Sequence, residues 1–172
     1  TRRSSDLFAA LRDIFAKEAQ RHKELQSSEK CDGYSRKVYE RLVNGSATEV
    51  ELSSALLDLS AMLHSHYDVA PVIIIDEYDT PIQQGHSEDY YDKIIRFMRN
   101  LFSGGFKDNS HLSFGFLTGI LRVAKESIFS GMNNLSINSV LDNKYSAYFG
   151  FTADEVREMA AYYDAADKYD EI

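Results

Sequence analysis

The chain has 172 residues, of which 44% are apolar and 12% aromatic, so a packed domain is expected and a disordered chain is excluded. Its formal net charge of −8 disfavours a broad nucleic-acid-binding face, because an acidic surface repels phosphates. The only cysteine, Cys31, cannot form an intrachain disulfide and fits a reducing compartment. The chain contains no run of about 18 apolar residues that could cross a membrane, so we expect a cytoplasmic location without membrane partners.

The first third of the chain is predicted to be helical. Apolar residues recur at helical spacing over 7–15 and again over 34–42. Thr48 and Glu51 have the spacing of a capping box, in which each side chain bonds to the backbone N–H of the other residue. A strong apolar stripe follows them and predicts a third helix. Residues 1–67 are therefore expected to form a helical segment.

The pattern then changes to that of a strand, a helix and a second strand. Residues 69–75 form a continuous, mostly β-branched run, which predicts a strand buried on both faces of a parallel sheet. Residues 94–102 carry a helical stripe, which Gly104 and Gly105 are expected to end. The apolar run 112–119 predicts another buried strand. Such a βαβ order predicts that the two strands are parallel neighbours.

The rest of the chain is less regular. Residues 120–148 predict a short helix among irregular loops. Thr152 and Glu155 have the spacing of a second capping box before a helix, and the acidic end of the chain should fray. We expect one incomplete domain, with its core at 68–150 and a helix and tail at 151–172.

Two adjacent carboxylates, Asp76 and Glu77, follow the first predicted strand directly. Ligands of open α/β sheets bind beyond the carboxyl ends of the strands. One carboxylate there can hold Mg²⁺, while the other polarises an attacking water. A β-branched strand that ends in Asp-Glu is the Walker B pattern of P-loop ATPases. The alternative is a solvated turn, since acidic residues commonly end strands.

The second predicted strand ends in Thr118, and Arg122 follows four residues later. In P-loop ATPases with an additional strand, the neighbouring strand ends in a polar residue that senses the γ-phosphate of ATP. A nearby arginine can contact phosphate or stabilise the charge that is transferred. Thr118 and Arg122 fit these roles, although a turn residue and an exposed charge are the simpler interpretations.

Three blocks of sequence resemble the bacterial AAA-ATPase-like family, in the family's order. They are VIIIDEYDTPI at 72–82, FLTGILR with AKESIFSGMNNL at 116–135, and FGFT with the following Glu-Val at 149–156. The resemblance covers roughly 72–163. Members of this family often carry a PD-(D/E)XK nuclease-like domain after the ATPase domain, which would lie beyond Ile172.

The resemblance implies a function for each of these site residues. Asp76 would organise Mg²⁺, Glu77 would position the attacking water, and Thr118 and Arg122 would read the γ-phosphate of ATP. One departure from the family affects activity, because the chain has no Gly-Lys dipeptide and therefore no phosphate-binding loop of the form G-x-x-x-x-G-K-S/T. The chain also begins with Thr1 rather than Met, so we expect a piece of a longer protein. Because the phosphate-binding loop is absent, we expect this piece to bind ATP weakly or not at all by itself.

Histidines and the cysteine are not expected to form a site. His64 and His66 are two apart on a predicted helix and face different directions, which does not suit a metal site. His22 and His111 are isolated in the sequence. Cys31 has no evident cation beside it and is expected to be a loop residue.

The sequence thus predicts an α/β fold, a partial P-loop NTPase-like core with parallel strands preceded by a helical segment. Its function would be the Walker B and sensor segment of an ATP-hydrolysing enzyme, with a nucleotide as partner and with protein partners or self-association. One alternative is a degenerate ATPase core that acts as a non-enzymatic interaction module. Another is a helicase-like motor, because 76–79 spells D-E-x-D, although 116–119 fits poorly to the Ser-Ala-Thr motif that such motors need.

Overall fold

The computed structural model of the chain describes residues 2–87, 90–107, 109–120, 128–129, 132 and 134–171. It divides into two compact units, Thr1–Asn134 and Leu135–Ile172. The chain is mixed α/β, as the sequence predicts, with many helices and a small parallel sheet. The assignment of all 172 residues to one incomplete ATPase-like domain stays a prediction.

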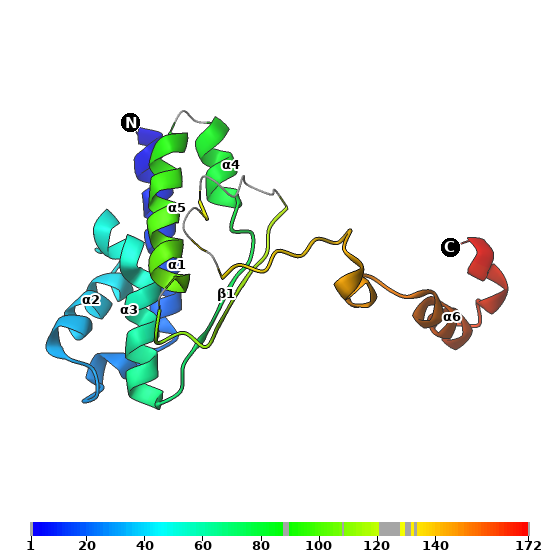
Figure 1. Cartoon of the computed structure of the whole chain (residues 1–172), viewed down its shortest axis with the longest axis horizontal. Coiled ribbons are helices and arrows are strands. Elements are labelled where there is room, and N and C mark those ends of the chain that lie inside the picture. Colours follow the sequence, from blue (N-terminus) through cyan, green and yellow to red (C-terminus); the bar gives the residue numbers. More distant parts are fainter. Residues whose placement is uncertain are drawn as a thin grey trace. The chain divides into compact units, whose positions relative to one another are not determined.

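The first unit begins with the predicted helical segment (Figure 1). Its elements are α1 (Arg2–Gln20), the 3₁₀ helix η1 (Lys23–Ser27), α2 (Gly33–Val43) and α3 (Glu49–Tyr67). They are followed by β1 (Val72–Ile75), α4 (Thr80–Ser87), α5 (Tyr91–Phe106) and β2 (Phe114–Leu117). Helix α4 is an element that the sequence analysis did not predict.

Local capping residues determine where α2 and α3 begin. Asp32 accepts hydrogen bonds from the backbone N–H groups of Tyr34 (2.7 Å) and Ser35 (2.9 Å) at the start of α2. The predicted capping box of Thr48 and Glu51 is present at the start of α3. The Thr48 N–H, and secondarily the Arg41 guanidinium, hold the pKa of the Glu51 carboxyl below its usual value. Their contribution to stability is therefore present at neutral pH and lost on acidification.

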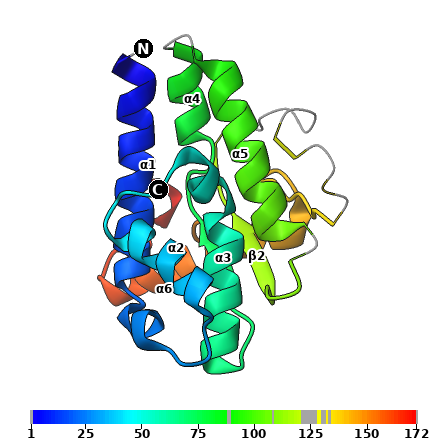
Figure 2. The same ribbon diagram turned by 90° about the vertical axis from the view of Figure 1, so that its left-hand side faces the viewer.

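Helices α3 and α5 lie side by side and form the centre of the first unit (Figure 2). The prediction that Gly104 and Gly105 end α5 is wrong, since the helix continues through both to Phe106. A Cβ on Gly105 would lie only 2.9 Å from the Leu56 side chain on α3. Glycine at this position therefore serves close helix packing rather than helix termination.

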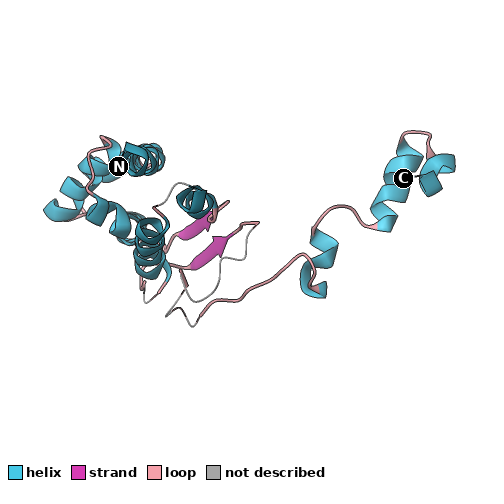
Figure 3. Cartoon of the chain, turned by 90° about the horizontal axis from the view of Figure 1, so that it is seen from above, coloured by secondary structure: helices cyan, strands magenta, loops and turns pink. Residues whose placement is uncertain are grey.

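The two strands run parallel and side by side, as predicted (Figure 3). Their register places Val72 opposite Phe114 and Ile75 opposite Leu117. The face with Ile73, Ile75 and Leu117 packs against the core, and Phe106 of α5 contacts Gly115 there. The phenylalanine at the end of α5 thus fits over the one strand position without a side chain.

The opposite face of the sheet is exposed, so the prediction of strands buried on both faces is wrong. Ile74 is 71% exposed and Phe116 is 50% exposed, and Val72 and Phe114 lie exposed beside them. Within the part of the chain that the structure describes, the helices of the first unit cover only the face with Ile73 and Ile75, and the other face is left exposed. Continuous apolarity in these strands therefore does not reflect burial within this unit.

The second unit contains the 3₁₀ helix η2 (Asn143–Tyr148), α6 (Ala153–Tyr162) and the 3₁₀ helix η3 (Ala166–Glu171). The predicted capping box of Thr152 and Glu155 is present at the start of α6. The 3₁₀ helix η3 contacts α6, and the Tyr169 ring lies 4.9 Å from the Arg157 guanidinium, a cation–π contact. The fraying expected for the acidic end of the chain stays a prediction.

None of the helices in the described part of the chain combines the length and the apolarity that crossing a bilayer requires.

Replacing Gly105 with alanine should destabilise the protein, whereas replacing its neighbour Gly104 should not. The Gly105→Ala side chain would collide with Leu56, and overpacking of this kind costs about 1–3 kcal/mol. A Cβ on Gly104 meets nothing closer than 3.9 Å. Gly104→Ala should therefore stabilise α5 by up to about 1 kcal/mol through helix propensity. Urea denaturation measures both, and equal midpoints would contradict the close approach of α3 and α5.

Candidate functional site

Two predicted site residues meet at the carboxyl edge of the sheet. The Thr118 hydroxyl donates a hydrogen bond to Oδ1 of Asp76, although the two residues are 42 positions apart in the sequence. The parallel register explains the contact, because Ile75 lies opposite Leu117 and the next residue of each strand follows at the same edge. Asp76 is exposed and Thr118 is half-buried, so the pair is open to solvent.

The backbone pairing is irregular at this edge. The Thr118 N–H donates to the Ile75 carbonyl at 2.9 Å, as regular parallel pairing requires. The Thr118 carbonyl should then accept a bond from the N–H of Glu77, but it accepts one from Tyr78 at 3.0 Å. One extra residue is therefore inserted opposite Thr118, as in a β-bulge. Such insertions re-aim side chains and are common beside active sites.

Glu77 occupies this extra position in a left-handed conformation, with φ of 52°. Its N–H, released from the ladder, donates to Oδ1 of Asp76 at 3.0 Å. Its carbonyl accepts a bond from the Thr80 N–H at 3.0 Å. A left-handed residue other than glycine costs roughly 1–2 kcal/mol and persists only where neighbouring bonds impose it. The bulge thus takes Glu77 out of the strand pairing next to Asp76, and its exposed carboxylate accepts a hydrogen bond from the Thr80 hydroxyl at 3.5 Å.

Behind the exposed pair lies a buried carboxylate, Asp79, whose side chain is 1% exposed. Its Oδ2 accepts a hydrogen bond from Gln83 Nε2 at 2.8 Å, and its carbonyl accepts from the N–H groups of Ile82 and Gln83 at the start of α4. The sequence analysis used this residue only in the D-E-x-D pattern of the helicase-like alternative and did not predict this helix. The signal was available, because Asp79 precedes Thr80 and Pro81, and an acidic residue before a proline is typical of a helix start.

The block that follows Arg122 contributes packing behind the turn. The Phe129 ring stacks on Phe102 of α5, with ring centroids 5.8 Å apart, and contacts Tyr78 edge-on at 5.4 Å. Sequence reasoning found no chemistry for this block. Arg122 itself lies outside the described residues, so its role stays a prediction.

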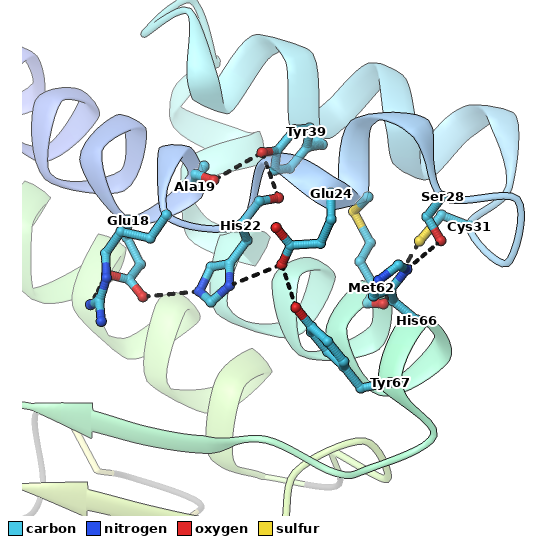
Figure 4. Close-up of polar contacts among 11 residues, drawn as sticks. Glu18, Ala19, His22, Glu24, Ser28, Cys31, Tyr39, Met62, His66 and Tyr67 are labelled. Atoms are coloured by element: carbon cyan, nitrogen blue, oxygen red, sulfur yellow. Dashed lines mark hydrogen bonds and ion pairs between the residues drawn. The ribbon is translucent and has the colours of Figure 1, made fainter.

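A second group of polar contacts lies in the helical part and joins α1, η1, α2 and α3 (Figure 4). The Tyr39 hydroxyl is shared between the backbone carbonyls of Ala19 (2.9 Å) and His22 (2.8 Å). The Tyr67 hydroxyl donates to Glu24 at 2.6 Å, and this bond is the main reason why the pKa of the Glu24 carboxyl lies below its usual value. These groups satisfy one another, so the cluster functions as a joint between helices.

The histidines and the cysteine contribute to packing in the first unit. His111 is not isolated, because its Nδ1 lies 3.2 Å from Nδ1 of His64 and ties the segment before β2 to α3. The described residues contain no group of three or more His, Cys, Asp or Glu side chains arranged to hold a metal ion. Cys31 lies in the loop between η1 and α2, is buried, and contacts the Met62 carbonyl.

Comparison with known proteins places the chain in a family. The model of the AAA-ATPase-like family, described as a predicted AAA-ATPase, matches residues 2–129, and the chain belongs to this family. The family assigned from the sequence motifs is thereby confirmed, and the match includes the helical segment, where no motif was recognised. The family suggests nucleotide binding.

One relative has 32% identity over 125 residues. It comes from Azotobacter chroococcum mcd 1 and is described as an uncharacterized protein in the vnfD 5′ region. The match covers 72% of this chain but 24% of the relative, so the chain spans about a quarter of the relative's length. No solved structure matches the chain significantly.

Glu77→Asn should raise the thermal stability of the protein relative to Glu77→Gln. Asparagine tolerates the left-handed conformation far better than other residues, whereas glutamine retains the backbone penalty of glutamate. The expected gain is about 1 kcal/mol, or a rise in Tm of about 2–4 °C for a protein of this size. Scanning calorimetry of the two variants measures it. Identical Tm values would mean that position 77 does not carry this strain.

Proposed function

We propose that this chain supplies the Walker B and sensor part of an ATP-binding and ATP-hydrolysing site in a longer protein. One observation carries the proposal. Asp76 and Thr118 end two neighbouring parallel strands and share a hydrogen bond, and Glu77 is raised out of the strand pairing beside them. Membership of a family of predicted AAA-ATPases supports the same function.

The oxygen donors at this edge suit Mg²⁺. Both hydrogen bonds to the Asp76 carboxylate, from the Glu77 N–H and the Thr118 hydroxyl, fall on Oδ1. They orient the group through one of its two oxygens. Mg²⁺ keeps several waters and takes one or two carboxylates together with phosphate oxygens, so one exposed, oriented carboxylate fits its needs. Asp76 would hold Mg²⁺, and Mg²⁺ would neutralise the phosphates of ATP.

Glu77 would act as the general base in this proposal. A water attacks the γ-phosphorus, the bond from that phosphorus to the bridging oxygen breaks, and ADP leaves. Glu77 orients the water and takes up its proton. The Glu77 side chain suits this role because it is exposed: the backbone N–H of Glu77 bonds to Asp76, while the carboxylate accepts one long bond from the Thr80 hydroxyl.

Thr118 and Arg122 would contact the γ-phosphate. The Thr118 hydroxyl already bonds to Asp76, so it lies beside the group that would hold Mg²⁺. Arg122 follows four residues later and would stabilise the charge that develops on the transferred phosphoryl group. The 172 residues contain no G-x-x-x-x-G-K-S/T sequence, so the phosphate-binding loop would come from another part of the longer protein.

In the full-length protein, Glu77→Gln should retain ATP but hydrolyse it slowly. The substitution keeps the size of the side chain and removes its proton acceptor, which is typically worth about a hundredfold or more in rate. Asp76→Asn should behave differently, because a weaker Mg²⁺ site lowers the affinity for Mg²⁺–ATP as well as turnover. Calorimetric affinities and single-turnover rates test both. Unchanged turnover in Glu77→Gln would remove its catalytic role and favour the interaction-module hypothesis.

A matched pair of variants tests Thr118. Thr118→Ser keeps the hydroxyl and should retain most of the turnover. Thr118→Val keeps the shape but removes the hydrogen bond to Asp76, and bonds to charged groups are worth about 1.5–3 kcal/mol, so turnover should fall about tenfold or more. Single-turnover assays of the full-length variants measure the difference. Equal rates in both variants would exclude a role for the hydroxyl.

A further inference from the structure

Asp79 is a buried carboxylate that takes no part in the proposed chemistry. Its side chain is 1% exposed, whereas Asp76 and Glu77, on the same turn, are exposed. Burying a carboxylate is costly unless specific partners hold it. A side chain without a carboxylate could start α4 as well, so helix capping alone does not account for a buried carboxylate at this position.

Its two carboxylate oxygens face two different parts of the site. Oδ2 accepts the hydrogen bond from Gln83 on α4, at 2.8 Å. Oδ1 lies against Gly119, the residue after Thr118, so closely that a Cβ on Gly119 would come within 2.6 Å of it. The same Cβ would come within 2.8 Å of the Tyr78 ring. Asp79 therefore joins the turn after β1 to the end of β2.

The turn after β1 cannot move towards the core, because the ring of Tyr78 is already packed there. The Tyr78 ring contacts Phe129 at a centroid distance of 5.4 Å and Phe102 at 6.2 Å, and Phe102 is fully buried. A larger residue at position 119 would therefore push the turn outwards, towards the side that carries Glu77. The spacing between the turn and the end of β2 is thus set by a buried contact behind the exposed pair.

We propose that Asp79 is a positioning residue: its carboxylate, held by Gln83 and seated on Gly119, locks the turn with Asp76 and Glu77 against the end of β2. The inference rests on the proposed function, because the locked turn aims Glu77 at the attacking water. A misplacement of about 1 Å can cost a catalytic step about a hundredfold. Nucleotide affinity depends on many contacts and should change much less.

The test compares Asp79→Asn and Gly119→Ala in the full-length protein. Asp79→Asn keeps the shape of the side chain and replaces one oxygen acceptor by a donor. Gly119→Ala leaves the Asp79 residue unchanged, but the added methyl group should push the Asp79 carboxylate out of position. This variant therefore tests the contact independently if Asp79→Asn folds poorly. Gly104→Ala is the matched control, because a Cβ there meets nothing closer than 3.9 Å. Three quantities are measured: the single-turnover rate with ATP, the affinity for Mg²⁺–ATP, and amide hydrogen exchange.

Each test variant should lose about tenfold or more in single-turnover rate, with affinity changed by less than about threefold. The amides of Tyr78 and Thr118, which bond across the bulge, should exchange faster than in the wild type. The amide of Ser113, which bonds to the Pro71 carbonyl at the other end of the strands, should not change. The double variant should lose no more rate than the worse single variant, because both changes break one contact. Gly104→Ala should leave the rate unchanged and should not speed exchange at any of these amides.

Two results would overturn the inference. Unchanged exchange at Tyr78 and Thr118 in both test variants would show that Asp79 does not lock the turn. Equally faster exchange at Ser113 would show that Asp79 stabilises the sheet as a whole. A wild-type protein that binds but does not hydrolyse ATP would instead refute the proposed function, and the exchange comparison alone would then decide whether the lock exists.

Discussion

Three hydrogen bonds of one residue hold the candidate site together. Thr118 donates its N–H to the Ile75 carbonyl, accepts the Tyr78 N–H at its own carbonyl, and donates its hydroxyl to Asp76. These bonds bring the end of β2 to both sides of the turn after β1. Glu77 lies between the two backbone bonds and is therefore forced out of the pairing. The position of every exposed group at this edge depends on how Thr118 is held.

The helices fix the sheet on which this arrangement depends. Helix α5 packs on α3 through Gly105 and on β2 through Phe106, which fits against Gly115. At the other end of the same helices, Lys93 of α5 pairs with Glu49 of α3 at 2.8 Å. The helical segment has no motif of its own, yet it belongs to the match with the family model. In the structure this segment supports α5 and, through α5, the strand β2 that Thr118 follows.

Features that depend on neighbouring residues could be predicted from the sequence. The capping boxes at Thr48 and Thr152 are local patterns, and both are present. The parallel pairing also followed, because a strand, helix and strand in succession allow few arrangements. It placed Asp76 and Thr118 at one edge, and their hydrogen bond fits that expectation.

Features that depend on contacts between distant residues could not be predicted. Gly105 resembles a helix end in the sequence, and only the approach of Leu56 shows that it is a packing position. The apolar strands suggested burial on both faces, but apolarity alone does not say which structure covers each face. The bulge was also hidden, because Asp76-Glu77 reads the same in a regular strand end. The close approach of Asp79 to Gly119, which follows the other strand, is likewise a contact between distant residues that the sequence does not reveal.

The extra residue in the bulge has a consequence for how this sequence can vary in length. A substitution at Glu77 leaves the number of residues between Ile75 and Tyr78 unchanged, so both backbone bonds to Thr118 can still form. A one-residue deletion there would restore regular pairing, and regular pairing has no position for a second projecting carboxylate. A one-residue insertion would separate Tyr78 from Thr118 and detach the start of α4. Length variation among related chains should therefore be tolerated in the surrounding loops and rejected in this short segment.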